Sequence, residues 1–339
     1  MKPIFDYIAG TGGVGKGILF NLLGDQNLGR NESRLAVLTD FQDFCKLHII
    51  LHYTSKLLRG AAPVYPIGRV GADENGRELL SLMESAGMDT RFMLADAARA
   101  TMFAVCFQYP DGDGGNLTAA NSACDAVCAA DIDRFFTSEN AQGRGLLLAA
   151  PEVPVDTRAH LLRRGKEHGC FNAASLLPGE AAEFLSREIF RDIDLLAINQ
   201  DEAAAILSAA GEPFVDGQIA EACGSFLRAR YPQMSVVVTL GRAGALVCSD
   251  AGFTNIPPCV VTPVSTAGAG DCFLGTILAC YACGVPLGNA AQLAALSAGV
   301  KVQCKDTIHF GIDEGLLLSS SEAWGVDGGV EIRAFLRGE

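Results

Sequence analysis

The strongest constraint on the fold is a regular alternation between short apolar runs and longer segments with helical periodicity. Val236-Val237-Val238 is apolar at every position, which is typical of a strand buried on both faces of a parallel sheet. Parallel strands need helical crossovers, so the alternation predicts an α/β fold with a doubly wound, mostly parallel sheet flanked by helices. With 339 residues, 49% of them hydrophobic, the chain is long enough to bury such a core.

The expected elements cover most of the chain. The apolar runs predict strands, and the helical patterns predict helices. Two glycine-rich and polar stretches, at about 11–38 and 101–124, break the rhythm and predict a small excursion from a single domain spanning 1–339. The expected strands are 5–9, 64–67, 102–108, 145–149, 195–198, 235–239 and 245–248, and the expected helices are 75–86, 155–168, 181–187, 200–209, 218–231, 271–283 and 287–304.

Composition limits the classes of binding partner and the cellular compartment that we expect for this chain. The formal net charge of −13 repels anionic surfaces, so we expect neither nucleic acid nor membrane partners. No apolar run reaches the roughly 20 residues of a membrane span, and the start of the chain lacks the pattern of a signal peptide. The 12 cysteines are irregularly spaced, unlike those of a secreted disulfide scaffold, so we expect a reducing cytoplasmic setting.

One motif precedes the expected helix at 271–283. Ser265-Thr266-Ala267-Gly268-Ala269-Gly270-Asp271 places small residues where backbone N–H groups can gather around an anion, at the positive end of a helix. Asp271 adds a carboxylate beside that anion site, and phosphoryl transfer requires both groups. The same residues also suit a plain helix cap after a glycine-rich turn, and the motif alone leaves both interpretations open.

Three more segments accompany this motif. Gly68–Gly76 reads G-x-V-G-x-D-x-x-G, Asn199-Gln200-Asp201-Glu202 reads N-x-x-E, and Thr239–Ala245 reads T-L-G-x-x-G. In this order the four segments resemble the signatures of the ribokinase-like family of carbohydrate and nucleoside kinases, from about residue 64 to residue 304. The resemblance implies a ribokinase-like fold with a small β lid, formed by the excursion, that closes over the acceptor.

The resemblance also implies roles at the phosphoryl-transfer end. Asp271 would deprotonate the acceptor hydroxyl, and the N–H groups of Gly268, Ala269 and Gly270 would form the anion hole. Glu202 would order Mg²⁺ through water. Residues 297–307 would line the adenine side of an ATP site, and the other implied nucleotide-binding residues are Asn199, Thr239, Gly241, Gly244 and Thr266.

The function implied is an ATP-dependent kinase that phosphorylates a hydroxyl of a small molecule, a sugar or sugar derivative. A nucleoside kinase and a non-catalytic metabolite sensor on the same fold stay open as alternatives. The resemblance supports a homodimer formed through the lid, since a small projecting sheet leaves one face and an edge uncovered.

The chain departs from the family pattern near the acceptor. The loop after the first strand usually carries a carboxylate, but here it reads Gly10-Thr11-Gly12-Gly13-Val14-Gly15. We therefore expect the acceptor between Gly12, Gly13 and a helix start at 40–52, with Asp40 or Asp43 holding its hydroxyls, unless these two carboxylates only cap that helix. Asn116, after the second glycine-rich turn, is a further candidate. Ser265 replaces a family Asp or Asn near a monovalent-cation loop, so a K⁺ requirement is not firmly implied.

Other patterns suggest competing functions. Gly10–Lys16 matches the P-loop pattern G-x-x-x-x-G-K, so a P-loop NTPase is the alternative hypothesis. Against it, Gly17 stands where a P-loop has Ser or Thr. His48 and His52 share one helical face and could bind a metal, although no third ligand is evident. Arg30 and Arg34 could bind an anionic acceptor or simply be solvated.

Overall fold

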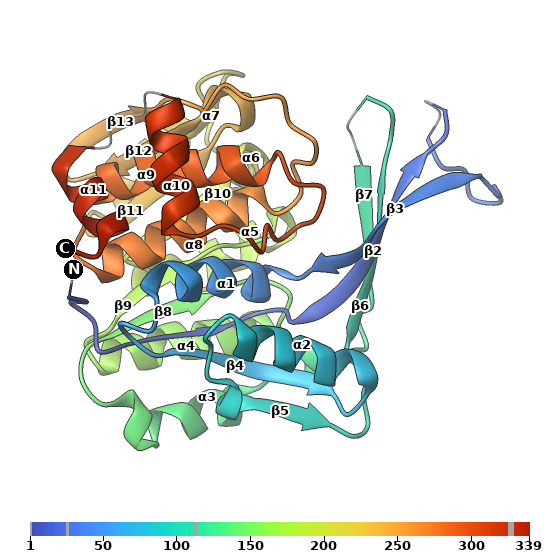
Figure 1. Cartoon of the computed structure of the whole chain (residues 1–339), viewed down its shortest axis with the longest axis horizontal. Helices are drawn as coiled ribbons and strands as arrows, with labels where there is room; N and C mark the ends of the chain where they lie inside the picture. The colour runs from blue at the N-terminus through green and yellow to red at the C-terminus, as the bar shows by residue number, and fades with distance from the viewer. Residues whose placement is uncertain (1, 25–26, 112–113, 325–328) are drawn as a thin grey trace.

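A nine-stranded sheet runs through the main body, with helices on both faces (Figure 1). The structure is a computed structural model and describes residues 2–24, 27–111, 114–324 and 329–339. The strand order is β13-β12-β11-β10-β9-β8-β1-β4-β5, in which every pair from β11 to β5 is parallel and β12 and β13 add two antiparallel pairings. The expected doubly wound, mostly parallel sheet is therefore confirmed.

The strands of the main sheet are short and mostly buried, as their continuous apolar runs predict. They are β1 (Tyr7–Thr11), β4 (Val64–Gly71), β5 (Met93–Asp96), β8 (Gly145–Ala149), β9 (Phe171–Ala174), β10 (Leu195–Asn199), β11 (Ser235–Thr239), β12 (Ala245–Ser249) and β13 (Gly252–Ile256).

The helices form two layers, each with its own hydrophobic core cluster. One layer holds α1 (Lys46–Leu58), α2 (Glu74–Ser85), α8 (Ala269–Ala282), α9 (Leu287–Lys301), α10 (Glu314–Ala323) and α11 (Gly329–Arg337). The other holds α3 (Ala129–Phe136), α4 (Val155–Glu167), α5 (Ala181–Ser186), α6 (Gln200–Ala210) and α7 (Ile219–Arg230).

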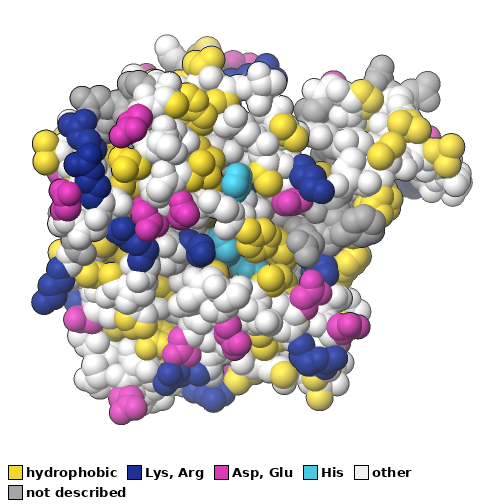
Figure 2. All heavy atoms as spheres, in the orientation of Figure 1, with side chains coloured by type: hydrophobic (Ala, Val, Ile, Leu, Met, Phe, Trp, Pro, Cys, Tyr) yellow, Lys and Arg dark blue, Asp and Glu magenta, His cyan; other side chains and the backbone are white. Residues whose placement is uncertain are grey.

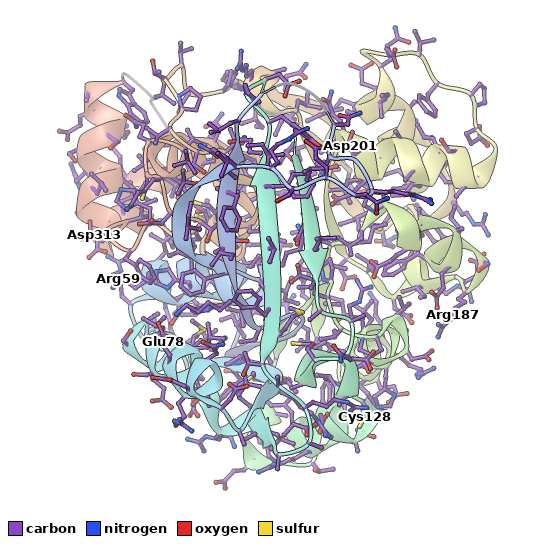
Figure 3. All side chains as sticks on the ribbon, turned by 90° about the vertical axis from the view of Figure 1, so that its right-hand side faces the viewer. Arg59, Glu78, Cys128, Arg187, Asp201 and Asp313 are labelled. Atoms are coloured by element: carbon purple, nitrogen blue, oxygen red, sulfur yellow. The ribbon has the colours of Figure 1, made fainter. Side chains whose placement is uncertain are left out.

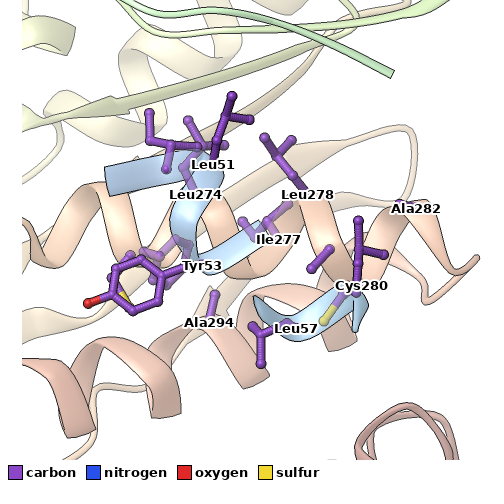
Figure 4. Packing of buried hydrophobic residues seen from close by; sticks show 14 of the residues in the cluster. Leu51, Tyr53, Leu57, Leu274, Ile277, Leu278, Cys280, Ala282 and Ala294 are labelled. Carbon is purple, nitrogen blue, oxygen red and sulfur yellow. The ribbon is translucent and has the colours of Figure 1, made fainter. Parts of the chain in front are cut away.

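Helices α1 and α8 pack closely side by side, as Figure 4 shows through Leu51, Leu274 and Ile277. A Cβ atom at Gly275 would lie 2.4 Å from the carbonyl oxygen of Ile50, so only glycine permits this approach. The hydroxyl of Thr54 donates to the Gly275 carbonyl at 3.1 Å. This packing fixes the N-termini of α1 and α8 relative to each other, and both carry side chains of the candidate site.

A second sheet of four strands projects from the main body (Figure 1). Its order is β3-β2-β6-β7, with bounds β2 (Gly15–Leu22), β3 (Ala36–Phe44), β6 (Met102–Gln108) and β7 (Gly114–Thr118). The two segments that form it therefore span 15–44 and 102–118, and the first runs past the expected limit at residue 38. We call these four strands the small sheet.

The expectation that a helix starts at residue 40 and runs to residue 52 is wrong for residues 40–44, which belong to a strand. Asp40 and Asp43 lie in β3, and α1 begins only at Lys46. The segment Ala36–Phe44 lacks a clean two-residue alternation of apolar and polar residues, and it becomes a strand by pairing with β2, through two irregularities in the register. Across the described part of the chain, no helix has the length and apolar character needed to cross a bilayer.

Candidate active site

The sheet topology predicts where a ligand binds. From the adjacent pair β1 and β8, the chain builds outward in opposite directions, through β4 and β5 on one side and β9 to β11 on the other. In an open parallel sheet, such a switch point leaves a crevice at the carboxyl ends of the strands. Here that crevice follows Thr11 of β1 and Ala149 of β8.

A cleft of about 950 Å³ lies beside this crevice. Residues predicted to bind the nucleotide or to act in catalysis line this cleft, and they come from three separate segments of the chain. Lys46 and Asp271 line the same cleft, and so do Pro258–Pro263 and Val302. The predicted residues that line it are Asn199, Thr239, Gly241, Gly244, Thr266, Gly268, Ala269, Gly270 and Asp271.

The segment before α8 turns sharply into the helix. Gly268 is its N-cap with φ +74°, and a Cβ atom there would lie 2.4 Å from the Thr307 carbonyl oxygen. The Ala269 N–H donates to the Thr266 carbonyl at 3.2 Å, and the first intrahelical bond joins the Cys272 N–H to Gly268. The N–H groups of Gly270 and Asp271 thus belong to the first turn of α8, where N–H groups have no intrahelical partner. Asp271 is the third residue of the helix rather than its cap.

Lys46 is a further candidate site residue, which the motifs did not indicate. It is the first residue of α1, and its Nζ lies 3.6 Å from Asp271 Oδ1. The negative charge of Asp271 raises the pKa of the Lys46 ammonium, and Glu202 and Glu152 add to this effect. A lysine that stays charged beside the helix N-terminus can attract the phosphates of a nucleotide.

Glu152 is a second residue that the motifs missed. It follows β8 with φ +73°, which is strained for a residue other than glycine. Its Oε2 accepts a bond from the Lys46 N–H at 3.1 Å, and it would lie 2.3 Å from a Cβ atom at Gly13. The pKa of Glu152 is raised to about 7, chiefly by burial and also by the charges of Asp271 and Asp43, against the opposing effect of Lys46. The sequence feature that could have indicated Glu152 is its position shortly after the buried strand β8.

Glu202 and Asn199 cap α6 reciprocally. Asn199 Oδ1 accepts from the Glu202 N–H at 2.9 Å, and Glu202 Oε2 accepts from the Asn199 N–H at 2.8 Å. Burial raises the pKa of Glu202, and the nearby Asp271 charge raises it too. A divalent cation with oxygen ligands suits a buried carboxylate that lies near a second one, so Mg²⁺ fits this place. Within the described residues there is no group of three or more metal-binding side chains.

The structure brings together only some of the residues predicted to bind the acceptor. Gly12 and Gly13 do not open space for a ligand, because Ala150 and Leu47 fill the position beside Gly12 and Glu152 fills that beside Gly13. Asp43 Oδ2 accepts a bond from the Cys106 thiol at 2.8 Å. Asn116 pairs with Cys106 across β6 and β7 and so lies on the same face of the small sheet. The side chain of Asp40 lies outside the described residues.

The P-loop reading does not fit the structure. Gly15 and Lys16 begin β2, so no helix follows the glycines as a P-loop requires. The Lys16 ammonium donates to both carboxylate oxygens of Glu78 in α2, at 2.9 and 2.8 Å. Figure 3 places Glu78 well away from Asp201, which lines the nucleotide cleft.

Lys16→Ala is therefore expected to leave nucleotide affinity within a few-fold of wild type. The lysine of a real P-loop reaches the β- and γ-phosphates, whereas this ammonium is held by Glu78. Calorimetric titration with ADP and an ATP analogue would measure the effect. A collapse of nucleotide binding in the variant would revive the P-loop reading.

His48 and His52 are buried in α1 rather than exposed at a binding site. Aromatic rings surround them, with Phe44 4.8 Å from His48 and Phe310 5.2 Å from His52 between ring centroids. Burial lowers the pKa of His48 to about 3 and that of His52 to about 4, so both rings are neutral at pH 7. Arg34 pairs with Glu32 at 2.5 Å in the loop between β2 and β3.

Known proteins share this fold. The structure aligns with a ribokinase of Cryptococcus neoformans var. grubii serotype A in complex with ADP, at a TM-score of 0.76 and 19% identity, over 94% of this chain and 99% of that one. The profile of the pfkB family carbohydrate kinases matches residues 51–314, which is more than half of the chain. The chain belongs to the pfkB carbohydrate kinase family.

Curated pfkB relatives agree with this assignment. A ribokinase of Schizosaccharomyces pombe is 27% identical over 245 residues, which cover 70% of this chain and 73% of the relative. A fructokinase of Klebsiella pneumoniae is 28% identical over 237 residues, which cover 67% of this chain and 74% of the relative. This pfkB protein is accordingly a phosphotransferase with an alcohol group as acceptor, and the ribokinase-like fold expected from the four motifs is confirmed.

Proposed function

We propose that this protein transfers the γ-phosphoryl group of ATP to a hydroxyl of a neutral sugar or sugar derivative, with Asp271 as the general base. The observation that carries the proposal is the meeting of Asp271 and Lys46 at the N-termini of two helices, 3.6 Å apart, where the nucleotide cleft reaches the β1–β8 crevice. A sensor that only bound a metabolite would not need a base held beside a cation at a helix N-terminus.

The reaction needs few covalent changes, and the chain supplies a group for each. The acceptor oxygen forms a bond to the γ-phosphorus while the bond from that phosphorus to the β,γ-bridging oxygen breaks, releasing ADP. Asp271 takes the proton of the acceptor hydroxyl. The first-turn N–H groups of α8 and the Lys46 ammonium stabilise negative charge on the phosphoryl oxygens. Mg²⁺, held beside Glu202, would neutralise charge on the nucleotide phosphates.

The acceptor side is rich in carboxylates. Asp43 and Asp271 both raise the pKa of Glu152, so each of them lies within electrostatic reach of Glu152. Carboxylates accept hydrogen bonds from hydroxyl groups but repel anions. This charge pattern favours a neutral polyol over a sugar acid or a sugar phosphate. Asp43 and Asn116 share the face of the small sheet that would close over such an acceptor.

The proposal is tested by acceptor-dependent ADP release. Pentoses, hexoses, nucleosides and the matching sugar acids would be compared at equal concentration with ATP and Mg²⁺. At least one neutral sugar should raise the rate of ADP release far above the rate without acceptor, and its acid should not. A preference for the acids or for nucleosides would overturn the neutral-sugar assignment.

The small sheet also carries an apolar face, and we expect the protein to form a homodimer through it. Val105 pairs with Leu117, and Ile18 with Val105, so these side chains share one face with Phe103 and Phe107. Leu117 is 69% exposed and Phe103 37%. Figure 2 shows hydrophobic side chains on the projecting part of the molecule. A second copy of the chain would cover this face and the open edge of the sheet.

Light scattering at micromolar concentration should give about twice the 35.6 kDa mass of the chain. Leu117→Arg should shift the mass to that of a monomer, because it places a charge in the apolar contact. Val215→Arg is the matched control, since Val215 is 67% exposed but lies outside the small sheet. A monomeric wild type would contradict the dimer.

A further inference from the structure

Lys301 is a buried cation beneath the segment that leads into α8. It is the last residue of α9 and is 0% exposed, and no other lysine among the described residues is classed as buried. Removing an ammonium group from water costs several kcal/mol unless good partners replace the water. A lysine at this place therefore needs partners that compensate for its burial.

Its partners include backbone oxygens of the segment 265–270. The Lys301 Nζ donates to the Ser265 carbonyl at 3.3 Å and to the Ala267 carbonyl. Thr266 and Gly268 of the same segment line the nucleotide cleft, and Asp271 follows directly. The ammonium group thus lies on the inner side of the segment whose outer side faces the nucleotide.

A second contact fixes the same segment from within. Gly268 lies against the backbone of Thr307, whose hydroxyl accepts a bond from the Phe44 N–H at 3.1 Å. Phe44 is two residues before Lys46. A shift of the 265–270 segment would therefore disturb Asp271 directly and reach Lys46 through Thr307.

Buried carbonyl oxygens that converge on one point need a positive charge, or their dipoles repel one another. Potassium ions satisfy such groups of carbonyls in selectivity filters, and an ammonium group can do the same with directed bonds. We propose that Lys301 is a positioning residue that serves as a built-in monovalent cation for the phosphate-binding segment. Phosphoryl transfer then needs no K⁺ from solution. The inference rests on the proposed function of this site.

The wild-type protein gives the first test. Replacing KCl by choline chloride at equal ionic strength should change kcat and the Kd of ADP by less than about twofold, because choline is too large to enter a carbonyl site. Activation of the wild type by K⁺ of tenfold or more would overturn the proposal.

Two variants of Lys301 give the second test. Lys301→Ala removes the charge and leaves room, so in choline buffer kcat should fall at least about tenfold and ADP should bind more weakly. Adding KCl, ammonium or methylammonium chloride should restore both quantities. Lys301→Met removes the charge but fills the space, so it should show the loss without the rescue. Lys2→Ala, at an exposed lysine outside the nucleotide cleft, is the matched control and should behave as wild type.

The outcomes separate a positioning role from a structural one. A residue needed only for folding would lower the melting temperature of Lys301→Ala, but small cations would not restore nucleotide affinity. Failure of every cation to rescue a folded Lys301→Ala variant, or unchanged kcat and Kd in that variant, would contradict the proposal. Calorimetry with ADP needs no acceptor, so the cation result can be read even if the proposed acceptor class is wrong.

Discussion

Asp271→Asn is expected to lower kcat by roughly 10²–10⁴-fold while leaving the Kd of ADP within a few-fold of wild type. The amide cannot take the proton of the acceptor hydroxyl, but it keeps the size of the side chain and the first turn of α8. Loss of the negative charge beside Lys46 should slightly favour an anionic nucleotide. Steady-state kinetics with the best acceptor and calorimetry with ADP would measure the two effects.

The same substitution at Asp250 is the control. Asp250 is exposed and pairs with Arg228, remote from the motifs of the site, so Asp250→Asn should keep wild-type kinetics. An Asp271→Asn variant that kept most of its turnover would exclude Asp271 as the base. Loss of nucleotide binding in that variant would instead point to a structural role.

Glu152→Gln is expected to lower kcat/KM for the acceptor by about tenfold to a hundredfold, chiefly through KM. We expect the Glu152 carboxylate to accept hydrogen bonds from acceptor hydroxyl groups. An amide accepts such bonds less well, and a buried hydroxyl left without a good partner weakens binding by about 1–3 kcal/mol. The KM for ATP should change little. Glu188→Gln is the matched control, since Glu188 is also a glutamate with positive φ and pairs with Arg230.

The same variant should be more stable than wild type at alkaline pH. Burial raises the pKa of Glu152 from 4.5 to about 7, so the folded state resists ionisation more than the unfolded state does. The wild type should therefore lose stability as the pH rises from about 4.5 through 7, and Glu152→Gln should not share that loss. Melting curves at pH 5 and pH 8 should show a gain of about 1–3 kcal/mol for the variant at pH 8 only.

Lower activity together with higher stability would mark Glu152 as a residue held in place for binding. If Glu152→Gln lost activity and stability together at pH 8, the side chain would be structural. An unchanged KM would move the acceptor away from the β1–β8 crevice.

The residues that local patterns predict for the nucleotide end of the site line one cleft. The motifs at 199–202, 239–245 and 265–271 each follow or precede a buried element, and the fold needs those small or polar residues at those points. Their chemistry is encoded within a few consecutive residues. The cleft unites them, as the order of the motifs had indicated.

The acceptor end depends on contacts between distant segments. The role that we propose for Lys46 depends on the packing of α1 on α8 at Gly275, and the role that we propose for Glu152 depends on the pairing of β8 with β1. No short pattern encodes either neighbour. The sequence has no glycine or proline between β3, which carries Asp40 and Asp43, and α1, so no local signal separates the strand from the helix that follows it. Lys301 lies 34 residues from Ala267 in the sequence, so no short motif could have indicated their contact either.

The central claim, transfer of a phosphoryl group to a hydroxyl of a sugar-like acceptor, is tested most directly by ³¹P nuclear magnetic resonance of the product mixture. With ATP, Mg²⁺ and the best neutral sugar, one phosphomonoester signal coupled to protons of the sugar should grow in step with ADP, and Asp271→Asn should abolish both. ADP accompanied only by inorganic phosphate, at a rate independent of every sugar, would contradict the account.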